Sequence, residues 1–208
     1  IICGRREEEL KEATKQLPSL ITRVCDLSVE SHRVELFKWI EKNHSDVNVL
    51  VNNAGIQNWM DVSDENFYKK ANDEITINAL APVHLTNLFL NLASIKTVMN
   101  VTSGLAFVPL AKVPVYCATK AFMRSFTLSL RHMLKQKNIE VIEIIPPALN
   151  TDLGAKGIHS AYPPVSDFIE SIFEQLKSGR TELTYAMSED RLKANNETIQ
   201  DYFNRMSP

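Results

Sequence analysis

Short apolar runs alternate with longer stretches of helical periodicity along this chain. The apolar, β-rich runs are Ile1–Cys3, Leu20–Cys25, Val47–Val51, Thr97–Val101, Ile139–Ile145 and Thr181–Ala186. The stretches with helical spacing are residues 6–17, 29–43, 64–93, 115–137, 165–178 and 189–206. Repeated alternation of strand and helix predicts an α/β fold, with a buried parallel sheet covered by helices on both faces.

Composition narrows the classes of protein that fit this pattern. The 208 residues predict one domain, 1–208, and 44% hydrophobic with 23% charged residues is typical of a soluble globular protein. A net charge of -2 disfavours a nucleic-acid partner, and the apolar runs are too short for a membrane span. Five scattered histidines predict no metal site, and three cysteines without CxxC spacing predict free thiols in the cytoplasm.

The strongest chemical signal is Tyr116 and Lys120, which follow Ser103 after a proline-containing loop. A tyrosine and a lysine four residues apart lie one turn apart on the same helical face. A nearby ammonium lowers the pKa of a phenol, so Tyr116 could exchange a proton with a carbonyl oxygen that Ser103 holds. Taken alone, the pair could also be two surface residues of an amphipathic helix.

Gly4, Arg5 and Arg6 follow the first predicted strand, where open α/β sheets bind the ribose of a dinucleotide. An acidic residue at this point holds a 2′-hydroxyl, whereas arginine accommodates a 2′-phosphate. The two arginines therefore favour NADP(H) over NAD(H), although NAD remains possible. The alternative is that both are solvated charges at the start of a glutamate-rich helix.

Further polar or small residues follow the other strands. Asp26, beside Leu27, could accept a hydrogen bond from the adenine amino group or cap a helix. The segment 52–55, with Asn53, Ala54 and Gly55, permits close approach of a ligand or makes a simple turn. Pro146 and Leu149 belong to a rigid turn that ends in Thr151, whose hydroxyl could hold a carboxamide. Asn78, in an apolar helical stretch, is expected to bend the helix, bond across the core or hold a water.

Together these motifs resemble the short-chain dehydrogenases/reductases, in that family's order and at about its spacings. Within the family the chain is most similar to the DltE-type bacterial oxidoreductases, through residues 103–109 and the ending from Tyr185 onward. The resemblance implies a Rossmann-like, doubly wound parallel sheet in three αβα layers. It also implies that helices near residues 72–93 and 115–137 form a homodimer or homotetramer.

The resemblance assigns roles to individual residues. Tyr116 would be the general acid/base, Lys120 would lower its pKa and bind the nicotinamide ribose, and Ser103 would orient the carbonyl. Asn78 would anchor a water of the proton relay. Contacts to the dinucleotide would come from Asp26, Leu27, Asn53, Ala54, Gly55, Pro146, Leu149 and Thr151.

The family's glycine-rich turn between the first strand and the first helix has no counterpart in residues 1–208. The sequence begins at what resembles the second strand of the family. Loss of the central first strand would split the sheet, so we expect the domain over residues 1–208 to be N-terminally incomplete. A smaller departure is Pro147, where the family usually has glycine.

The sequence thus predicts an NADP(H)-dependent oxidoreductase that interconverts a small-molecule carbonyl and a secondary alcohol. The alternatives are a non-catalytic relative that senses nucleotides or acts as a scaffold, and a dehydratase or epimerase on the same scaffold. Substrate specificity is expected in the loop after Thr151. There Asp152, His159 and Tyr162 could meet a polar substrate or close a lid, and we favour the lid.

Overall fold

A computed structural model describes residues 1–207. Its strands are β1 (Ile2–Gly4), β2 (Thr22–Val24), β3 (Val49–Asn52), β4 (Thr97–Val101), β5 (Glu140–Ile145) and β6 (Glu182–Thr184). Its helices are α1 (Glu7–Gln16), α2 (Glu30–Asn43), α3 (Phe67–Ile75), α4 (Ala81–Phe89), α5 (Pro114–Leu134), α6 (Val165–Lys177), α7 (Met187–Leu192) and α8 (Ile199–Met206). All strand pairings are parallel, which confirms the predicted α/β class.

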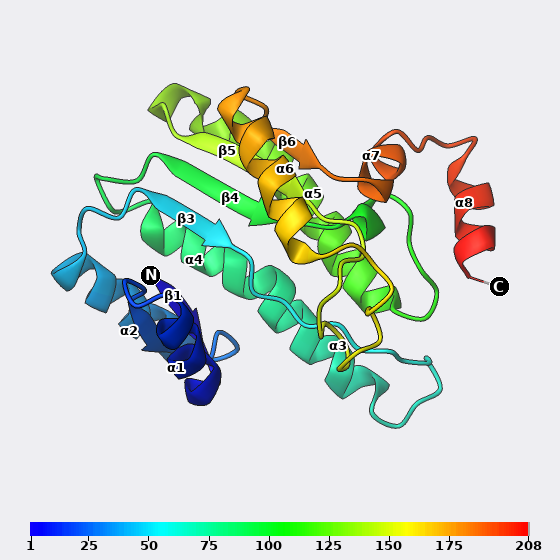
Figure 1. The fold of residues 1–208 in the computed structure, drawn as a ribbon, viewed down its shortest axis with the longest axis horizontal. Helices are drawn as coiled ribbons and strands as arrows, with labels where there is room; N and C mark the ends of the chain where they lie inside the picture. Colours follow the sequence, from blue (N-terminus) through cyan, green and yellow to red (C-terminus); the bar gives the residue numbers. More distant parts are fainter. Residues whose placement is uncertain (208) are drawn as a thin grey trace.

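The sheet is in two pieces, as expected when residues 1–208 lack a counterpart of the family's first strand. One piece pairs β1 with β2, and the other runs β3-β4-β5-β6. The β1–β2 piece lies with α1 and α2 on the β3 side of the larger sheet (Figure 1). Within residues 1–207, β1 and β3 therefore each have one edge without a partner strand.

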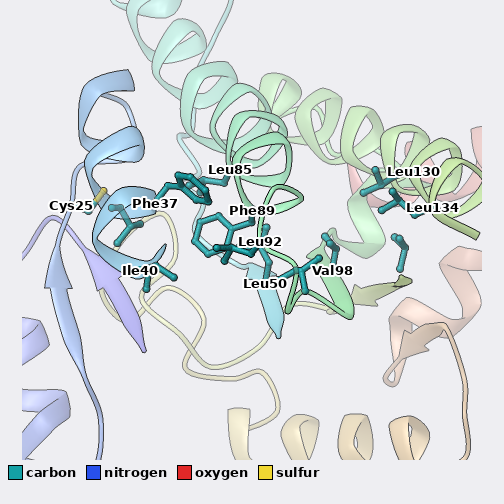
Figure 2. Packing of buried hydrophobic residues seen from close by; sticks show 13 residues of the cluster. Cys25, Phe37, Ile40, Leu50, Leu85, Phe89, Leu92, Val98, Leu130 and Leu134 are labelled. Atoms are coloured by element: carbon teal, nitrogen blue, oxygen red, sulfur yellow. The ribbon is translucent and has the colours of Figure 1, made fainter. Parts of the chain in front are cut away.

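Helices cover both faces of the four-stranded sheet (Figure 1). On one face, α2, α4 and α5 form the main apolar cluster with side chains from β3, β4 and β5. Figure 2 shows Phe37 of α2 and Phe89 of α4 at the centre of this cluster, with ring centroids 5.6 Å apart. On the other face, Phe168 and Ile172 of α6 pack against Ile142 and Leu183. Three αβα layers result, as the sequence predicts.

Two predicted helices are interrupted. The stretch 64–93 begins its helix only at Phe67, and a π-helical segment, Thr76–Leu80, separates α3 from α4. The single helix predicted over residues 189–206 is wrong, because α7 ends at Leu192 and α8 begins at Ile199. Between them, the Asn195 side chain accepts hydrogen bonds from the N–H groups of residues 197 and 198, which competes with helix formation.

Candidate active site

Ser103, Tyr116 and Lys120 line one cavity of about 1330 Å³ at the carboxyl ends of β3, β4 and β5. Ser103 follows β4 and is held by its own turn, since its Oγ accepts a hydrogen bond from Leu105 N–H at 3.1 Å. Tyr116 and Lys120 lie one turn apart in α5, which begins at Pro114, a residue that suits the first turn of a helix. The three predicted catalytic residues of this motif are therefore brought together.

Burial controls the protonation of this group. Only 6% of Tyr116 and 5% of Lys120 is exposed. Contrary to the expectation that Lys120 lowers it, the pKa of Tyr116 is raised in this structure, because burial outweighs the lowering effect of the neighbouring Ser103 hydroxyl. Burial also lowers the pKa of Lys120 to about 8. The lysine Nζ donates to the Val101 carbonyl at 2.8 Å and lies 5.5 Å from the centre of the Tyr116 ring.

Asn78 lies behind the cavity wall. It sits in the π-helical segment, is 1% exposed, and pairs with the Ile56 backbone through both Oδ1 and Nδ2 at 2.8 Å. Its Nδ2 also donates to Thr119 Oγ1 at 3.2 Å. The expected bond across the core is therefore present, and the helix is π-wound at this residue.

Glu74, which sequence reasoning missed, supports the same loop from one turn earlier. It is fully buried, and its Oε1 accepts hydrogen bonds from the backbone N–H and the side-chain amide of Asn58. Burial raises the pKa of this carboxyl. Its spacing of four residues from Asn78 was the available signal, since two polar groups one turn apart share a helical face.

The ends of β3 and β4 are joined by buried amides. Asn52 donates to Asn100 Oδ1 at 2.9 Å, and Asn100 in turn donates to Thr127 of α5 at 2.9 Å. These bonds hold the strand ends that carry segment 52–55 and Ser103 against α5. Asn52 thereby contributes to the position of the site without lining its cavity.

Six of the predicted dinucleotide contacts line the catalytic cavity: Asn53, Ala54, Gly55, Pro146, Leu149 and Thr151. Gly55 is required for space and not for an unusual torsion, because it is absent from the glycines with positive φ. A Cβ there would lie 3.3 Å from Asn78 Oδ1 and 3.7 Å from Lys120 Nζ. The glycine therefore lets the segment pack closely against Asn78 and Lys120.

Arg5 and Asp26 line a second hollow of about 300 Å³, beyond β1 and β2. Hydrogen bonds from Ser28 lower the pKa of Asp26, and the nearby Arg5 lowers it further. Asp26 does not cap α2, whose N-cap is Val29, and instead holds the Ser28 turn. The contact of Asp26 with adenine stays a prediction.

Three predicted nucleotide contacts are not brought to either hollow. Arg6 forms an ion pair with Glu9 at 3.4 Å on the surface of α1, which is the solvated-charge alternative. Gly4 is occupied in strand pairing, since its carbonyl accepts from Cys25 N–H at 2.9 Å. The Leu27 carbonyl accepts a hydrogen bond from Arg33. Within residues 1–207, no three His, Cys, Asp or Glu side chains are grouped to hold a metal ion.

Comparisons with known proteins agree with this geometry. Residues 1–160 match the family model described as short chain dehydrogenase. The chain belongs to the short-chain dehydrogenase/reductase family. It is 44% identical to the "Uncharacterized oxidoreductase DltE" of Bacillus subtilis (strain 168) over 195 residues, which is 88% of this chain and 77% of that protein.

The chain is also similar to more distant proteins. The chain is 30% identical to "NADP-dependent 3-hydroxy acid dehydrogenase YdfG" of Shigella flexneri, over 70% of this chain and 60% of that protein. A short-chain dehydrogenase of Burkholderia cenocepacia J2315, solved in complex with NADP, superimposes with a TM-score of 0.82 at 20% identity. That superposition covers 99% of this chain and 85% of the other, and it supports the Rossmann fold.

Proposed function

We propose that this protein is an NADP(H)-dependent oxidoreductase that interconverts a small-molecule carbonyl and a secondary alcohol. The observation that carries the proposal is the convergence of Ser103, Tyr116 and Lys120 in one cavity with segment 52–55 and Thr151. Family membership supplies the reaction class, and the relatives named above as NADP-dependent or NADP-bound support the choice of cofactor.

In this reaction Tyr116, Ser103 and Lys120 would have different roles. The Tyr116 hydroxyl donates a proton to the developing alkoxide in reduction, and the Tyr116 phenolate takes the proton from the alcohol hydroxyl in oxidation. Ser103 Oγ donates a hydrogen bond that holds the same oxygen. Lys120 stabilises the phenolate when it forms, and it orients the nicotinamide ribose. The bound nicotinamide supplies or accepts the hydride.

The raised pKa of Tyr116 fits the acid role in reduction, because the tyrosine holds its proton until the alkoxide forms. The ammonium of Lys120 is close enough to act on the phenolate, at 5.5 Å from the ring centre. Asn78 would hold the Ile56 carbonyl beside a water of the proton relay, since Asn78 Nδ2 already donates to that carbonyl.

Wider properties follow from the same proposal. We infer a homodimer or homotetramer through α4 and α5, and the exposed Phe122, Leu128 and Met133 of α5 support this surface. The three cysteines are free, which supports a cytoplasmic location. None of the helices in residues 1–207 combines the length and apolar character needed to cross a membrane.

The test is NADPH oxidation with a panel of aldehydes and ketones, using wild type and Tyr116→Phe. General acid catalysis is worth about 10²- to 10⁴-fold, so Tyr116→Phe is expected to lose that much turnover. NADPH binding, followed by fluorescence, should stay within about twofold of wild type, because Phe keeps the ring. Turnover by Tyr116→Phe at the wild-type rate would overturn the role of Tyr116.

The second candidate is a non-catalytic relative that binds nucleotide. It is not favoured, because a protein without turnover has no need of Ser103, Tyr116 and Lys120 together. Nucleotide binding by wild type with no turnover of any carbonyl in the panel, or of the matching alcohols with NADP⁺, would favour it.

A further inference from the structure

Arg191 lies on the wall of the catalytic cavity, next to Ser103. It belongs to α7, which lies beyond the carboxyl ends of β4 and β6 (Figure 1), and it lines the same cavity as Ser103 and Tyr116. Its side chain packs on Gly104, the residue after Ser103. A Cβ at Gly104 would lie 2.9 Å from Arg191 Cδ and 3.4 Å from its Nη1.

The Arg191 guanidinium has no carboxylate partner among residues 1–207. Its hydrogen bond goes to Met206 Sδ at 3.1 Å, and a thioether sulfur is a weak acceptor. Burial lowers its pKa, and the groups that act in the opposite direction are Tyr162 and Cys117, neither of which is a carboxylate. By contrast, Arg124 forms ion pairs with Glu143 and Glu182. A half-buried charge without a counter-ion is costly unless a ligand supplies one.

A second unpaired polar group lines the same cavity. His159 Nδ1 is buried and has no hydrogen-bond partner among residues 1–207. The His159 and Tyr162 rings make an edge contact with centroids 5.6 Å apart, and both residues line the cavity with Arg191. Arg191, Tyr162 and His159 therefore line the cavity with polar groups that pair with no carboxylate among residues 1–207.

The surroundings of Tyr116 are apolar. Tyr116 packs with Val113 and Cys117, and Leu110 and Leu153 lie against this group. A substrate carbonyl at Tyr116 would thus have hydrocarbon surface around it and the guanidinium near Ser103. The cavity's other non-catalytic cation, Lys112, is exposed and lies over the Trp59 ring at 5.6 Å from its centre.

We propose that Arg191, with Tyr162 and His159, binds an anionic group of the substrate, a carboxylate or a phosphate, while the substrate carbonyl meets Tyr116 and Ser103. The proposal rests on the oxidoreductase function and specifies its substrate class. It replaces the expectation that His159 and Tyr162 merely close a lid.

The test compares 3-oxobutanoate with its methyl ester, and dihydroxyacetone phosphate with dihydroxyacetone. Both members of each pair have the same carbonyl, and only the first carries an anionic group. Wild type is expected to favour at least one anionic member by about 10-fold or more in kcat/KM. Arg191→Gln should raise KM for that anion by about 10- to 100-fold, the range for a hydrogen bond to a charged group, and leave the neutral partner unchanged. Comparison of the 3-oxobutanoate pair with the dihydroxyacetone phosphate pair shows whether the site binds a carboxylate or a phosphate.

Three variants act as controls. Lys193→Gln removes one positive charge from an exposed residue just beyond α7, where Lys193 pairs with Glu189. Lys112→Gln removes the exposed cation of the cavity. Both should keep the preference for the anion. Arg191→Lys should keep part of the preference for the anion, because lysine keeps the positive charge but lacks the planar guanidinium of arginine.

The proposal is overturned if the kcat/KM of wild type shows no preference for the anionic substrates. It is also overturned if Arg191→Gln lowers kcat/KM equally for the charged and the neutral substrates. A rise in KM for NADPH with every substrate would instead assign Arg191 to the cofactor. If wild type binds NADPH and reduces nothing, the proposed function has failed. Calorimetry of 3-oxobutanoate and dihydroxyacetone phosphate with wild type and Arg191→Gln then decides the anion site alone. Equal binding by both proteins, or none by either, overturns it.

Discussion

The Lys120 ammonium lies 5.5 Å from the centre of the Tyr116 ring and donates a hydrogen bond to the Val101 carbonyl at 2.8 Å. Both side chains are almost completely buried, and burial opposes the charged form of each. The pKa of Tyr116 is raised, and that of Lys120 falls to about 8. The pair therefore lies on the cavity wall with little exposed surface, where a nearby negative charge would favour the ammonium form of Lys120.

This burial gives Lys120 a measurable effect on stability. The pKa of Lys120 is about 8 in the folded chain against an ordinary value of 10.5, so its charge destabilises the folded state below pH 8. That cost disappears as the pH rises from about 8 to about 10.5. Lys120→Met removes it, so the stability of Lys120→Met relative to wild type should fall by about 2 kcal/mol between pH 7 and pH 10. Urea unfolding at the two pH values measures the difference.

Lys38→Met is the matched control, since Lys38 is exposed on α2. Its unfolding free energy relative to wild type should not change over this pH range. A constant difference for Lys120→Met as well would contradict the buried, depressed lysine.

For Glu74 we expect the stability of the folded chain to depend on pH in the opposite direction to that expected for Lys120. Burial raises the pKa of this carboxyl above its ordinary 4.5, so its contribution to stability is fully present below pH 4.5. The contribution is lost as the pH rises through the folded pKa. Glu74→Gln carries no titrating group and can still accept from Asn58 N–H. Relative to wild type, it should therefore become more stable between pH 4 and pH 8.

Glu74→Ala separates the hydrogen bond from the charge. It leaves the Asn58 N–H without its buried acceptor, so it should be less stable than Glu74→Gln by about 1–3 kcal/mol at both pH values. Thermal unfolding of wild type and both variants at pH 4 and pH 8 gives the comparison. A Glu74→Gln variant that loses stability toward pH 8 would show that the ionised carboxylate is the favoured form.

Much of the fold could be read from the sequence, because buried parallel strands are short apolar runs and amphipathic helices have their own period. The predicted strand Thr97–Val101 coincides with β4, and predicted site residues that follow β3, β4 and β5 meet in one cavity. The break between α7 and α8 was missed, because the side-chain bonds of Asn195 and Thr198 compete with a helix that the polar pattern allows.

Arg191 and Glu74 could not be assigned to the site with the same ease. Arg191 reaches the cavity through the placement of α7 beyond β6, which is a tertiary contact without a local pattern. The electrostatic role of Lys120 also depends on tertiary burial. The four-residue spacing predicts its contact with Tyr116 but not the loss of solvent that sets both pKa values.

Arg5 should distinguish NADPH from NADH. It lines the hollow that also holds Asp26, and it has no ion pair among residues 1–207, so its guanidinium is available for a 2′-phosphate. Arg5→Ala is expected to weaken NADPH binding by about 10-fold or more and NADH binding by about twofold or less. Fluorescence titration of both nucleotides measures this. Arg6→Ala is the matched control and should leave the affinities for NADPH and NADH unchanged, since Arg6 pairs with Glu9. If Arg5→Ala weakens the binding of both nucleotides equally, Arg5 does not bind the 2′-phosphate.

The ion pairs of Arg124 stabilise the strand ends behind Ser103. Glu143 is fully buried, and it accepts a hydrogen bond from Thr102 Oγ1 at 2.7 Å as well as from Arg124. Arg124 also bonds to Glu182, so it links α5 to both β5 and β6. Arg124→Met leaves the Glu143 carboxylate buried without its counter-charge, which typically costs about 3–5 kcal/mol.

A double-mutant cycle in chemical denaturation isolates this interaction. Adding Glu143→Gln to Arg124→Met removes the uncompensated charge while the amide still accepts from Thr102. The double variant should therefore be more stable than Arg124→Met alone, by about 1–3 kcal/mol. Additive losses would mean that Arg124 acts through its packing over the Phe107 ring, 5.2 Å from its centre, and not through Glu143.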